Sequence, residues 1–367
     1  MRSVSVLILS PADGGGAASI ARQDANSLVD LGLKVGYITI DNLVENQTIQ
    51  QHWLPFIKAS SLLERLLRLT LGQVTSLLGV VYLVNKFHYD AIINHVPHIS
   101  KMCHAACQIC GIPNIQVIHL PLSSFKAKKW MKPGKMNFSI SERGEQDLIE
   151  RWGVKRESVY LLPPAIQVKE VSDDEISRNC KMFDIPPGHQ TVACVALFNA
   201  QKNHESLIHI WEKVVKQEPD AMLLLAGDGP LIGVIKKMVN DRHLTQNVRF
   251  LGMVEPGWVY ERSSFCVLTS KDEGIPLVFL EAAAHQRAFI SFDTGSNSEF
   301  IRSNWNGILV PSGDEQSMIA SILTCLWQPQ TCIELGGHAF ESYKNISSGV
   351  NRGELLSNCL DEMIRRE

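Results

Sequence analysis

Residues 265–284 read Phe265-Cys-Val-Leu-Thr-Ser-Lys-Asp-Glu-Gly-Ile-Pro-Leu-Val-Phe-Leu-Glu-Ala-Ala-Ala284, and this stretch decides the fold. Its first six residues predict a buried strand, and its apolar, alanine-rich end predicts a helix. Between them, Gly274 gives the backbone of the turn its freedom, and Pro276 suits the first turn of the helix. The stretch is therefore a strand–turn–helix unit, the repeating element of a parallel α/β sheet.

Two carboxylates flank this turn, with Glu273 on the loop after the strand and Glu281 inside the helix. The first N–H groups of a helix lack partners within it, so a helix start binds anions, and phosphate is the usual one. The segment would thus combine an acid, a phosphate site and a second acid able to bind hydroxyl groups. An ordinary strand–turn–helix unit with two incidental glutamates has the same spacing, so the rest of the sequence must decide between these readings.

The composition indicates a globular protein with two domains. The chain has 367 residues, of which 45% are apolar and 20% charged, and this length exceeds what one ordinary core supports. No apolar run reaches the length that spans a bilayer. The short apolar segment after Met1 alternates with serine, so we interpret it as a first strand rather than a signal peptide. Nine cysteines without a regular framework indicate a reducing compartment, so a cytoplasmic location is expected.

The charge is distributed unevenly along the chain. Residues 1–163 carry 17 basic and 12 acidic side chains, a balance of +5, whereas residues 164–367 carry 18 and 26, a balance of −8. This asymmetry suggests that the first half faces something anionic. Within it, the basic segment 125–136 with Trp130 is the best candidate for a peripheral membrane contact, although a solvated loop has the same composition. No nucleic-acid partner is expected.

The first half begins with a βαβ unit. A strand over 4–9, a glycine-rich turn at 13–16 and a helix over 17–31 lead to the next strand at 35–40. This order predicts a parallel sheet, and the glycines let a ligand approach the backbone closely. The turn does not read Gly-x-Gly-x-x-Gly, so no NAD site is expected.

Two later strands, over 91–95 and 115–119, each end at a histidine. Between them, Cys103, Cys107 and Cys110 have the Cys-x3-Cys-x2-Cys spacing of radical S-adenosylmethionine enzymes. Here the spacing falls in a helical pattern, in which i, i+4 and i+7 share one face. Cysteine is often a small buried hydrophobic residue, so we expect these three side chains to be structural.

The alternation of strands and helices repeats in the second half. This pattern predicts an α/β protein with two domains, which we place at residues 1–163 and 191–345. A polar linker would occupy residues 164–190, and a C-terminal helix residues 346–367. Ligands of parallel sheets bind at the carboxyl ends of the strands, so we expect a cleft where the two sheets face each other.

Four segments of the second half occur in register with a known family. They are Ala196-Leu-Phe-Asn-Ala-Gln-Lys-Asn203, Leu225-Ala-Gly-Asp-Gly-Pro230, Phe250-Leu-Gly252 and the segment from Asp272 to Ala282. With the glycine turn at 13–16, they resemble the retaining glycosyltransferases of family 4 over essentially the whole chain. The resemblance implies the glycosyltransferase B architecture of two facing Rossmann-like domains with an inter-domain cleft. The first domain would bind the acceptor and the second the nucleotide sugar, and the C-terminal helix would pack back towards the first.

The resemblance also implies roles near the reacting bond. Lys202 would pair with the diphosphate, whose negative charge grows as the glycosidic bond breaks, so a cation there favours the transition state. Glu273 would lie near the donor sugar, and His119 would contact the sugar or its developing charge. These three residues are the catalytic candidates. Members of the family generally use no bound metal, so no metal or other cofactor is expected.

A second set of positions would bind the nucleotide sugar. Glu281 would hold the ribose hydroxyls, and the helix start beside it would hold phosphate. Backbone donors and the borders of the base pocket complete the set, which comprises Gly15, Gly16, Asn199, Gly227, Gly229, Val254, Gly274, Ile275, Pro276 and Leu277. The donor would be a UDP- or GDP-sugar. The acceptor would be lipid-linked or a polysaccharide, and the enzyme would work in the cytoplasm or peripherally on the cytoplasmic face of the membrane.

One position departs from the family pattern. Family members usually carry Gly-Arg where this chain has Ala196-Leu197, and that arginine joins the lysine on the diphosphate. Either another cation substitutes for it, with Arg262 and Lys271 as candidates, or activity is weakened. A catalytically silent, sugar-binding partner is therefore an alternative, and a nucleotide-sugar epimerase or a phosphorylase of the same fold is another.

Overall fold

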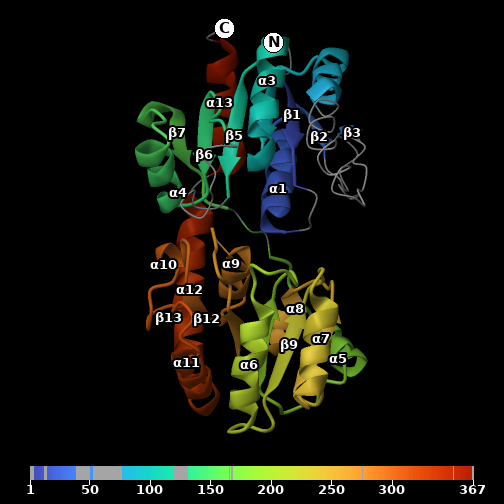
Figure 1. Ribbon diagram of the computed structural model, residues 1–367, viewed down its shortest axis with the longest axis vertical. Coiled ribbons are helices and arrows are strands. Elements are labelled where there is room, and N and C mark those ends of the chain that lie inside the picture. Colours follow the sequence, from blue (N-terminus) through green and yellow to red (C-terminus); the bar gives the residue numbers. More distant parts are fainter. Residues whose placement is uncertain are drawn as a thin grey trace, which may run out of the picture. The chain divides into compact units, whose positions relative to one another are not determined.

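The computed structural model describes residues 4–11, 15–38, 50–52, 77–119, 131–164, 166, 168–274, 276–349 and 351–365. The chain divides into two compact units, one formed by Met1–Ala165 with Val350–Glu367 and the other by Ile166–Gly349. Each unit is a parallel β-sheet with helices packed around it (Figure 1). The prediction of an α/β protein with two domains is confirmed.

The first unit has a seven-stranded sheet in the order β3-β2-β1-β4-β5-β6-β7. The strands are β1 (Ser5–Leu9), β2 (Lys34–Ile38), β3 (Gln50–His52), β4 (Ala91–Asn94), β5 (Asn114–Ile118), β6 (Met136–Ser139) and β7 (Val159–Leu161). The helices are α1 (Gly16–Asp30), one over 77–87, α3 (Ser100–Cys110), α4 (Glu142–Gln146) and α13 (Arg352–Arg365), with short 3-10 or π segments at Pro97–Ile99, Asp147–Arg151 and Arg156–Ser158. The sequence did not predict β3.

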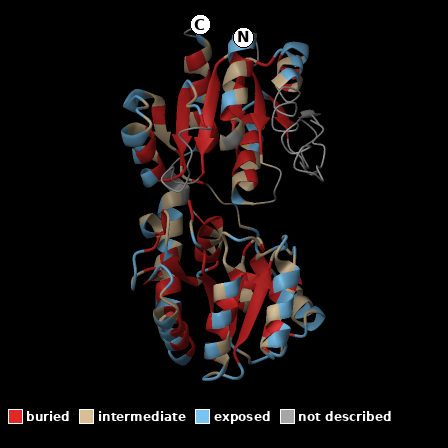
Figure 2. Cartoon of the chain, in the orientation of Figure 1, coloured by how far each residue is buried: buried red, intermediate tan, exposed pale blue. Residues whose placement is uncertain are grey.

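The strands of this sheet are buried on both faces. Val6, Leu7 and Ile8 of β1 have no exposed surface, as expected of a parallel strand that helices cover on either side. Figure 2 shows buried residues along the strands and on the inner faces of the helices. Strand β1 pairs in parallel with β2 and β4, and β4 pairs in parallel with β5. The carboxyl ends of β1, β4 and β5 therefore meet at one edge.

Helix α3 explains the three closely spaced cysteines. Cys103 and Cys107 are buried in an apolar cluster with helix 77–87 and the sheet. Cys110 is half-buried, and its sulfur accepts a weak hydrogen bond from Nδ2 of Asn85 at 3.8 Å. The prediction that these cysteines are structural is confirmed.

Helix α13 belongs to the first unit, although it follows the second unit in the sequence. It packs against α1, where an added Cβ at Gly353 would lie 2.8 Å from the Cβ of Ser27. Its first residue, Arg352, is buried and forms an ion pair with Asp24 of α1, with 2.8 Å between Nε and Oδ1. The C-terminal helix that we expected over 346–367 is therefore α13, which completes the first unit, whereas residues 346–349 end α12 (Pro329–Gly349) of the second unit.

The second unit has a six-stranded parallel sheet in the order β10-β9-β8-β11-β12-β13. The strands are β8 (Thr191–Val195), β9 (Met222–Ala226), β10 (Val248–Gly252), β11 (Phe265–Leu268), β12 (Ala288–Asp293) and β13 (Ile308–Pro311). The helices are α5 (Asp173–Met182), α6 (His204–Val215), α7 (Ile232–Asp241), α8 (Gly257–Arg262), α9 (Leu277–Ala284), α10 (Asn297–Phe300), α11 (Glu315–Trp327) and α12 (Pro329–Gly349). The strand–turn–helix expected at 265–284 is β11 followed by α9.

We expected residues 164–190 to be a linker, but residues from Ile166 onwards belong to the second unit. This segment contains α5, which lies against α8. Phe183 stacks on Trp258 of α8 with 5.7 Å between the ring centroids, and Arg249 of β10 pairs with Asp184 at 3.2 Å. None of the residues of α5 is buried. The polar composition therefore reflects an exposed helix rather than a free connection.

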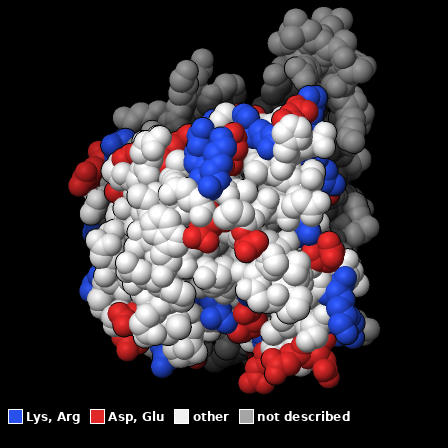
Figure 3. All heavy atoms as spheres, turned by 90° about the horizontal axis from the view of Figure 1, so that it is seen from below, with Lys and Arg blue, Asp and Glu red and all other residues white. Residues whose placement is uncertain are grey.

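The structure describes only part of the segment that we expected to contact a membrane. On the face drawn in Figure 3, acidic and basic side chains are interspersed with uncharged ones. Of the basic segment, residues 125–130 lie outside the described residues, and Lys132 and Lys135 are exposed. In the part of the chain that the structure describes, no helix has the length and apolar character needed to cross a membrane.

Candidate functional site

Loops gather at the carboxyl ends of the strands of the second unit. The loop after β8 binds the loop after β11, because the N–H of Lys271 donates to the carbonyl of Gln201 at 2.8 Å and Nε2 of Gln201 donates to the carbonyl of Asp272 at 2.9 Å. It also binds the loop after β9, through the N–H of Phe198 and the carbonyl of Asp228 at 2.9 Å. The sheet thus brings distant segments into one cluster, where ligands of such sheets bind.

Lys202 and Glu273 form an ion pair in this cluster. Nζ of Lys202 lies 2.6 Å from Oε1 of Glu273, and the two side chains are 19% and 5% exposed. The backbone N–H of Lys202 donates to Oδ1 of Asn199 at 3.0 Å, which fixes the loop that carries the lysine. The sequence placed both residues in the site but not in contact. An ammonium group has three N–H donors, so it can keep this carboxylate and still bind an anion.

The backbone of Glu273 is held by the loop after β12. The N–H of Ser296 donates to the carbonyl of Glu273 at 3.0 Å. Gly295 has a φ of +58°, and an added Cβ would lie 1.7 Å from the same carbonyl oxygen. Only glycine fits there. The sequence did not place Gly295 in the site, because a glycine in a turn does not show what the turn contacts.

Gly227 and Gly229 let two site loops pack against each other. Their φ angles are +135° and +154°. An added Cβ would lie 2.1 Å from the carbonyl oxygen of Ala196 in the first case and 2.7 Å from that of Phe198 in the second. We expected both glycines to border a nucleotide. The side that a Cβ would occupy faces protein, so close loop packing is the physical reason for glycine at these positions.

Helix α9 begins where the sequence predicted it. Pro276 is its N-cap, with φ −70° and ψ 107°, and no side chain caps the first turn. Gly274 and Leu277 are buried beside it, and Ile275 lies outside the described residues. Because the first N–H groups of a helix have no partner within it, this start has the donors that an anion needs.

Glu281 lies inside α9 and binds Tyr260 of α8. The Tyr260 hydroxyl donates to Oε2 of Glu281 at 2.6 Å, and Tyr260 is buried. Burial raises the pKa of Glu281, and the Tyr260 hydrogen bond opposes this shift. The charge of Glu255 raises that pKa further, so the loop that carries the half-buried Val254 lies near Glu281. Sequence reasoning missed Tyr260, because nothing in the pattern of α8 marks it.

In the first unit, His119 follows β5 and contacts His95, which follows the neighbouring strand β4. Nδ1 of His95 and Nε2 of His119 are 3.1 Å apart. Burial, as the main cause, lowers the pKa of His95 to about 3. It also lowers the pKa of His119 well below its usual value. The sequence placed only His119 in the site. Two neighbouring strands that each end in histidine were the available signal for His95.

Gly15 and Gly16 lie where α1 begins, after β1. Gly15 is the N-cap, and its carbonyl accepts the N–H of Ser19 at 3.0 Å, with no side-chain cap. The rest of the glycine turn, including Gly14, lies outside the described residues. The start of α1 thus offers backbone donors of the kind that bind anions, at the sheet edge that carries His119.

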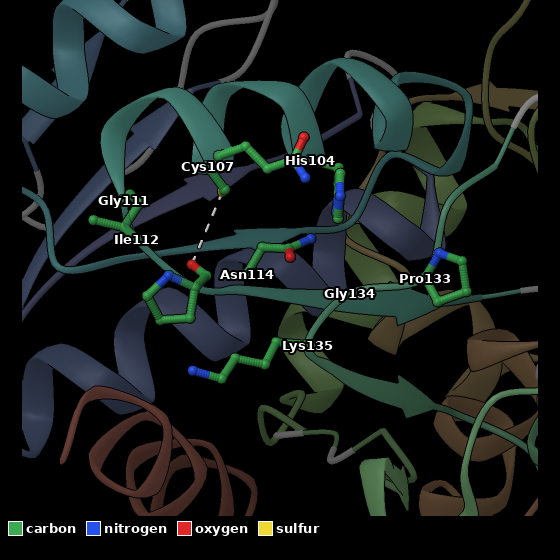
Figure 4. A pocket seen from close by; sticks show the side chains of 10 residues that line it. His104, Cys107, Gly111, Ile112, Asn114, Pro133, Gly134 and Lys135 are labelled. Carbon is green, nitrogen blue, oxygen red and sulfur yellow. Dashed lines mark hydrogen bonds between the residues drawn. The ribbon is translucent and has the colours of Figure 1, made fainter. Parts of the chain in front are cut away.

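A cavity of about 570 Å³ lies at the opposite edge of the same sheet (Figure 4). His104 and Cys107 of α3 line it, together with Asn114 and Lys135. Asn114 begins β5 and His119 follows the end of that strand, so the length of β5 separates the cavity from the histidine. The cavity is not part of the candidate site.

The sequence of the second unit matches a known family. Residues 189–328 match the model of the family Glycosyl transferases group 1. This segment is a group 1 glycosyltransferase domain. The match includes the loops after β8, β9, β11 and β12, so the Lys202–Glu273 pair and Glu281 all lie within the group 1 glycosyltransferase domain.

Curated relatives match parts of the chain. The poly(ribitol-phosphate) alpha-N-acetylglucosaminyltransferase of Staphylococcus aureus is 30% identical over 172 residues, which are 46% of this chain and 35% of that protein. The alpha-monoglucosyldiacylglycerol synthase of Streptococcus pneumoniae is 26% identical over 147 residues, which are 38% of this chain and 33% of that protein. The matches thus span about a third of the length of these two relatives.

A solved structure resembles the chain over nearly its whole length. HepE of Anabaena, in complex with UDP and glucose, has a TM-score of 0.81 at 17% identity and covers 98% of this chain and 100% of its own. A likeness at this identity shows the fold. The Rossmann-like folds of the glycosyltransferase B type that the sequence predicted are therefore confirmed.

Leu197 stands where the family pattern has an arginine. Of the two cations that were candidates to replace that arginine, Arg262 is excluded. Nη1 of Arg262 donates to Oγ1 of Thr191 at 2.9 Å, and its Nη2 donates to two backbone carbonyls. Thr191 begins β8, so Arg262 lies at the amino end of the sheet, and the hypothesis that it replaces the arginine is wrong. Lys271 is exposed at the carboxyl end, on a loop bound to the loop of Lys202.

Proposed function

We propose that this protein is a retaining glycosyltransferase that moves a sugar from a nucleotide diphosphate sugar to an acceptor. The observation that carries the proposal is the Lys202–Glu273 ion pair at 2.6 Å, within a group 1 glycosyltransferase domain. The start of α9 and Glu281 follow Glu273 directly in the chain. One short region thus supplies a cation and helix-start donors for phosphate, and a carboxylate for hydroxyl groups.

Lys202 is proposed to act on the leaving diphosphate. Breaking the glycosidic bond leaves negative charge on this group, so a fixed cation stabilises the transition state more than the ground state. Nζ keeps its contact with Glu273 and donates its remaining hydrogens to phosphate oxygens. The N–H groups after Pro276 add donors, and the exposed Lys271 is the proposed second cation in place of the missing arginine.

We propose that the donor binds without a metal ion. Lys202, Lys271 and the start of α9 provide positive potential for the diphosphate. Mixing the protein with EDTA before an assay is therefore expected to leave transfer unchanged.

The donor and acceptor classes are proposed from the names of similar proteins. HepE is bound to UDP and glucose, and the two curated relatives are named for poly(ribitol-phosphate) and for a glucosyldiacylglycerol. We propose a UDP- or GDP-sugar as the donor and a lipid-linked or polysaccharide acceptor in cell-surface glycan biosynthesis. Such an acceptor would place the protein at the cytoplasmic face of the membrane.

A thermal-shift screen tests the proposal. UDP, GDP and their sugar conjugates are added in turn, and a nucleotide at about a hundred times its Kd is expected to add about 2.7 kcal/mol of stability. For a unit of this size, that corresponds to a rise of roughly 5–10 °C in Tm. The variant Glu281→Ala should lose most of the shift. If no nucleotide or nucleotide sugar raises the Tm, the proposal is wrong.

A catalytically silent partner is the second candidate, because Leu197 replaces the arginine. Such a protein would bind the donor without consuming it. Incubating the protein with the selected nucleotide sugar and cell-envelope extract, and measuring release of the free nucleotide, separates the two candidates. Nucleotide release that requires the extract favours the transferase, and binding without release favours the silent partner.

The variant Tyr260→Phe is expected to raise the Kd for the selected nucleotide about tenfold, with kcat nearly unchanged. The hydroxyl holds Oε2 of Glu281 at 2.6 Å, and a hydrogen bond to a charged group contributes about 1.5–3 kcal/mol. Titration calorimetry measures Kd. Tyr343→Phe is the control, because that hydroxyl donates to the carbonyl of Ile166. If both variants and the wild type bind the nucleotide with the same Kd, the proposal that Glu281 binds the nucleotide is wrong.

A further inference from the structure

Four polar side chains of the first unit form one connected series of contacts. Nε and Nη2 of Arg352 donate to the two oxygens of Asp24 at 2.8 and 2.9 Å. Oδ2 of Asp24 lies 3.4 Å from Nε2 of His95, and Nδ1 of His95 lies 3.1 Å from Nε2 of His119. All four residues are more than nine-tenths buried. Asp24 and Arg352 satisfy each other, and the two histidines share one contact, whereas Nε2 of His95 and Nδ1 of His119 have no hydrogen-bond partner among the described residues.

Asp24 fixes one end of the series. Both of its oxygens accept from Arg352, whose Nη1 donates to the carbonyls of Leu162 and Pro163. A carboxylate held in this way by a guanidinium is ionised, so it can only accept hydrogen bonds. His95 is neutral, because burial and the charge of Arg352 lower its pKa to about 3. A neutral imidazole carries a hydrogen on one ring nitrogen only.

One arrangement of hydrogens satisfies these conditions. A bare Nε2 on His95 would direct its lone pair at the Asp24 carboxylate, which repels it. The hydrogen of His95 is therefore on Nε2, where 3.4 Å makes an electrostatic contact rather than a short hydrogen bond. Nδ1 of His95 is then an acceptor, so Nε2 of His119 must donate. Burial keeps His119 neutral as well, and its Nδ1 is left without a hydrogen.

We propose that Asp24 and His95 are positioning residues that hold His119 in the tautomer with a bare Nδ1. This inference rests on the proposed function, because it assigns the group that His119 meets in the donor. A bare Nδ1 accepts a hydrogen bond, so the group that it would meet is a hydrogen-bond donor such as a hydroxyl and not a phosphate oxygen. Nδ1 of His119 is buried and has no hydrogen-bond partner among the described residues, so its lone pair is not used by the part of the chain that the structure describes.

The first test locates the hydrogens directly. Long-range ¹H–¹⁵N spectra of the full chain labelled with ¹⁵N-histidine distinguish a ring nitrogen that bears a hydrogen from a bare one. The variants His95→Asn and His119→Asn assign the two sets of signals. At pH 7 we expect both rings to be neutral with the hydrogen on Nε2. A hydrogen on Nδ1 of His119, or a charged His119 ring, would overturn the proposal. No donor is present, so the result does not depend on the proposed function.

The second test compares His95→Asn with His95→Leu. The two side chains have nearly the same size and leave similar cavities, but only asparagine places an oxygen near the former Nδ1, where it can accept from His119. With the nucleotide sugar that the thermal screen selects, kcat of the leucine variant should be at least about tenfold below that of the asparagine variant. The Kd for the free nucleotide, which the second unit binds, should be equal in both.

Equal kcat values in two folded variants would overturn the positioning role even if the tautomer is as expected. Circular dichroism and Tm establish whether the variants are folded. If one variant is not folded, the ¹H–¹⁵N spectra of the wild type still determine the tautomer of His119. If the wild type neither binds nucleotides nor transfers sugar, the proposed function fails. In that case the spectra alone test the assigned tautomer.

Discussion

Lys202→Ala is expected to lower kcat of sugar transfer by about 100- to 1,000-fold, which is the usual loss when one electrostatic group at a developing charge is removed. Nζ of Lys202 pairs with Glu273. The Lys202 side chain is nevertheless 19% exposed, so an anionic ligand can reach it. Because the charge on the diphosphate grows during bond breaking, kcat should fall more than the affinity for the free nucleotide.

Two further variants separate catalysis from stability in this experiment. Alanine at 202 also leaves the buried Glu273 carboxylate without its partner, which destabilises the unit. The double variant Lys202→Ala/Glu273→Gln removes that unpaired charge, and we expect it to regain stability but not activity. Lys213→Ala, on the exposed face of α6, controls for the loss of a surface lysine. Wild-type kcat in the Lys202→Ala protein would eliminate the proposed role of the cation.

Arg352→Met is expected to lower the free energy of unfolding of the first unit by about 3–5 kcal/mol, because it leaves the buried Asp24 carboxylate unpaired. Arg352 is 3% exposed and Asp24 is fully buried. Urea denaturation followed by circular dichroism measures the change, with the two units analysed as separate transitions if they unfold separately.

The same helix supplies the control for this variant. Arg365 of α13 pairs with Asp361 at 3.4 Å, but both side chains are exposed, so Arg365→Met should cost less than about 0.5 kcal/mol. The double variant Asp24→Leu/Arg352→Met removes both charges, and we expect it to recover most of the loss, since apolar pairs often replace buried ion pairs without penalty. A loss below 1 kcal/mol in Arg352→Met would contradict the burial of the pair.

Most of the fold was predictable because the deciding signals are local. Apolar runs of strand length, helical patterns and glycine turns recur in alternation, and together they specify two parallel sheets. The errors have local causes as well. Strand β3 (Gln50–His52) is only three residues long, too short to show a pattern. Helix α5 is rich in charged and polar residues, and none of its residues is fully buried, so its sequence resembles that of a linker.

The site was predictable in part, and the limit was sequence separation. Glu273, Pro276 and Glu281 lie in one segment, so their proximity follows from the turn and the helix. Their partners come from elsewhere: Lys202 is 71 positions from Glu273, and Tyr260 is 21 positions from Glu281. No local rule pairs such residues. The resemblance to a family placed Lys202 near the site, but it gave no indication of Tyr260.

The position of α13 has a consequence for protein synthesis. Arg352 pairs with Asp24 across 328 positions of sequence, and the whole second unit is translated between Ala165 and Arg352. At about 5–20 residues per second, the ribosome needs roughly 10–40 s for that interval. The second unit can therefore fold while the first still lacks its last helix and keeps an uncompensated aspartate. The first unit is thus begun before the second unit and completed after it, and chaperones that protect nascent chains would meet it in this unfinished form.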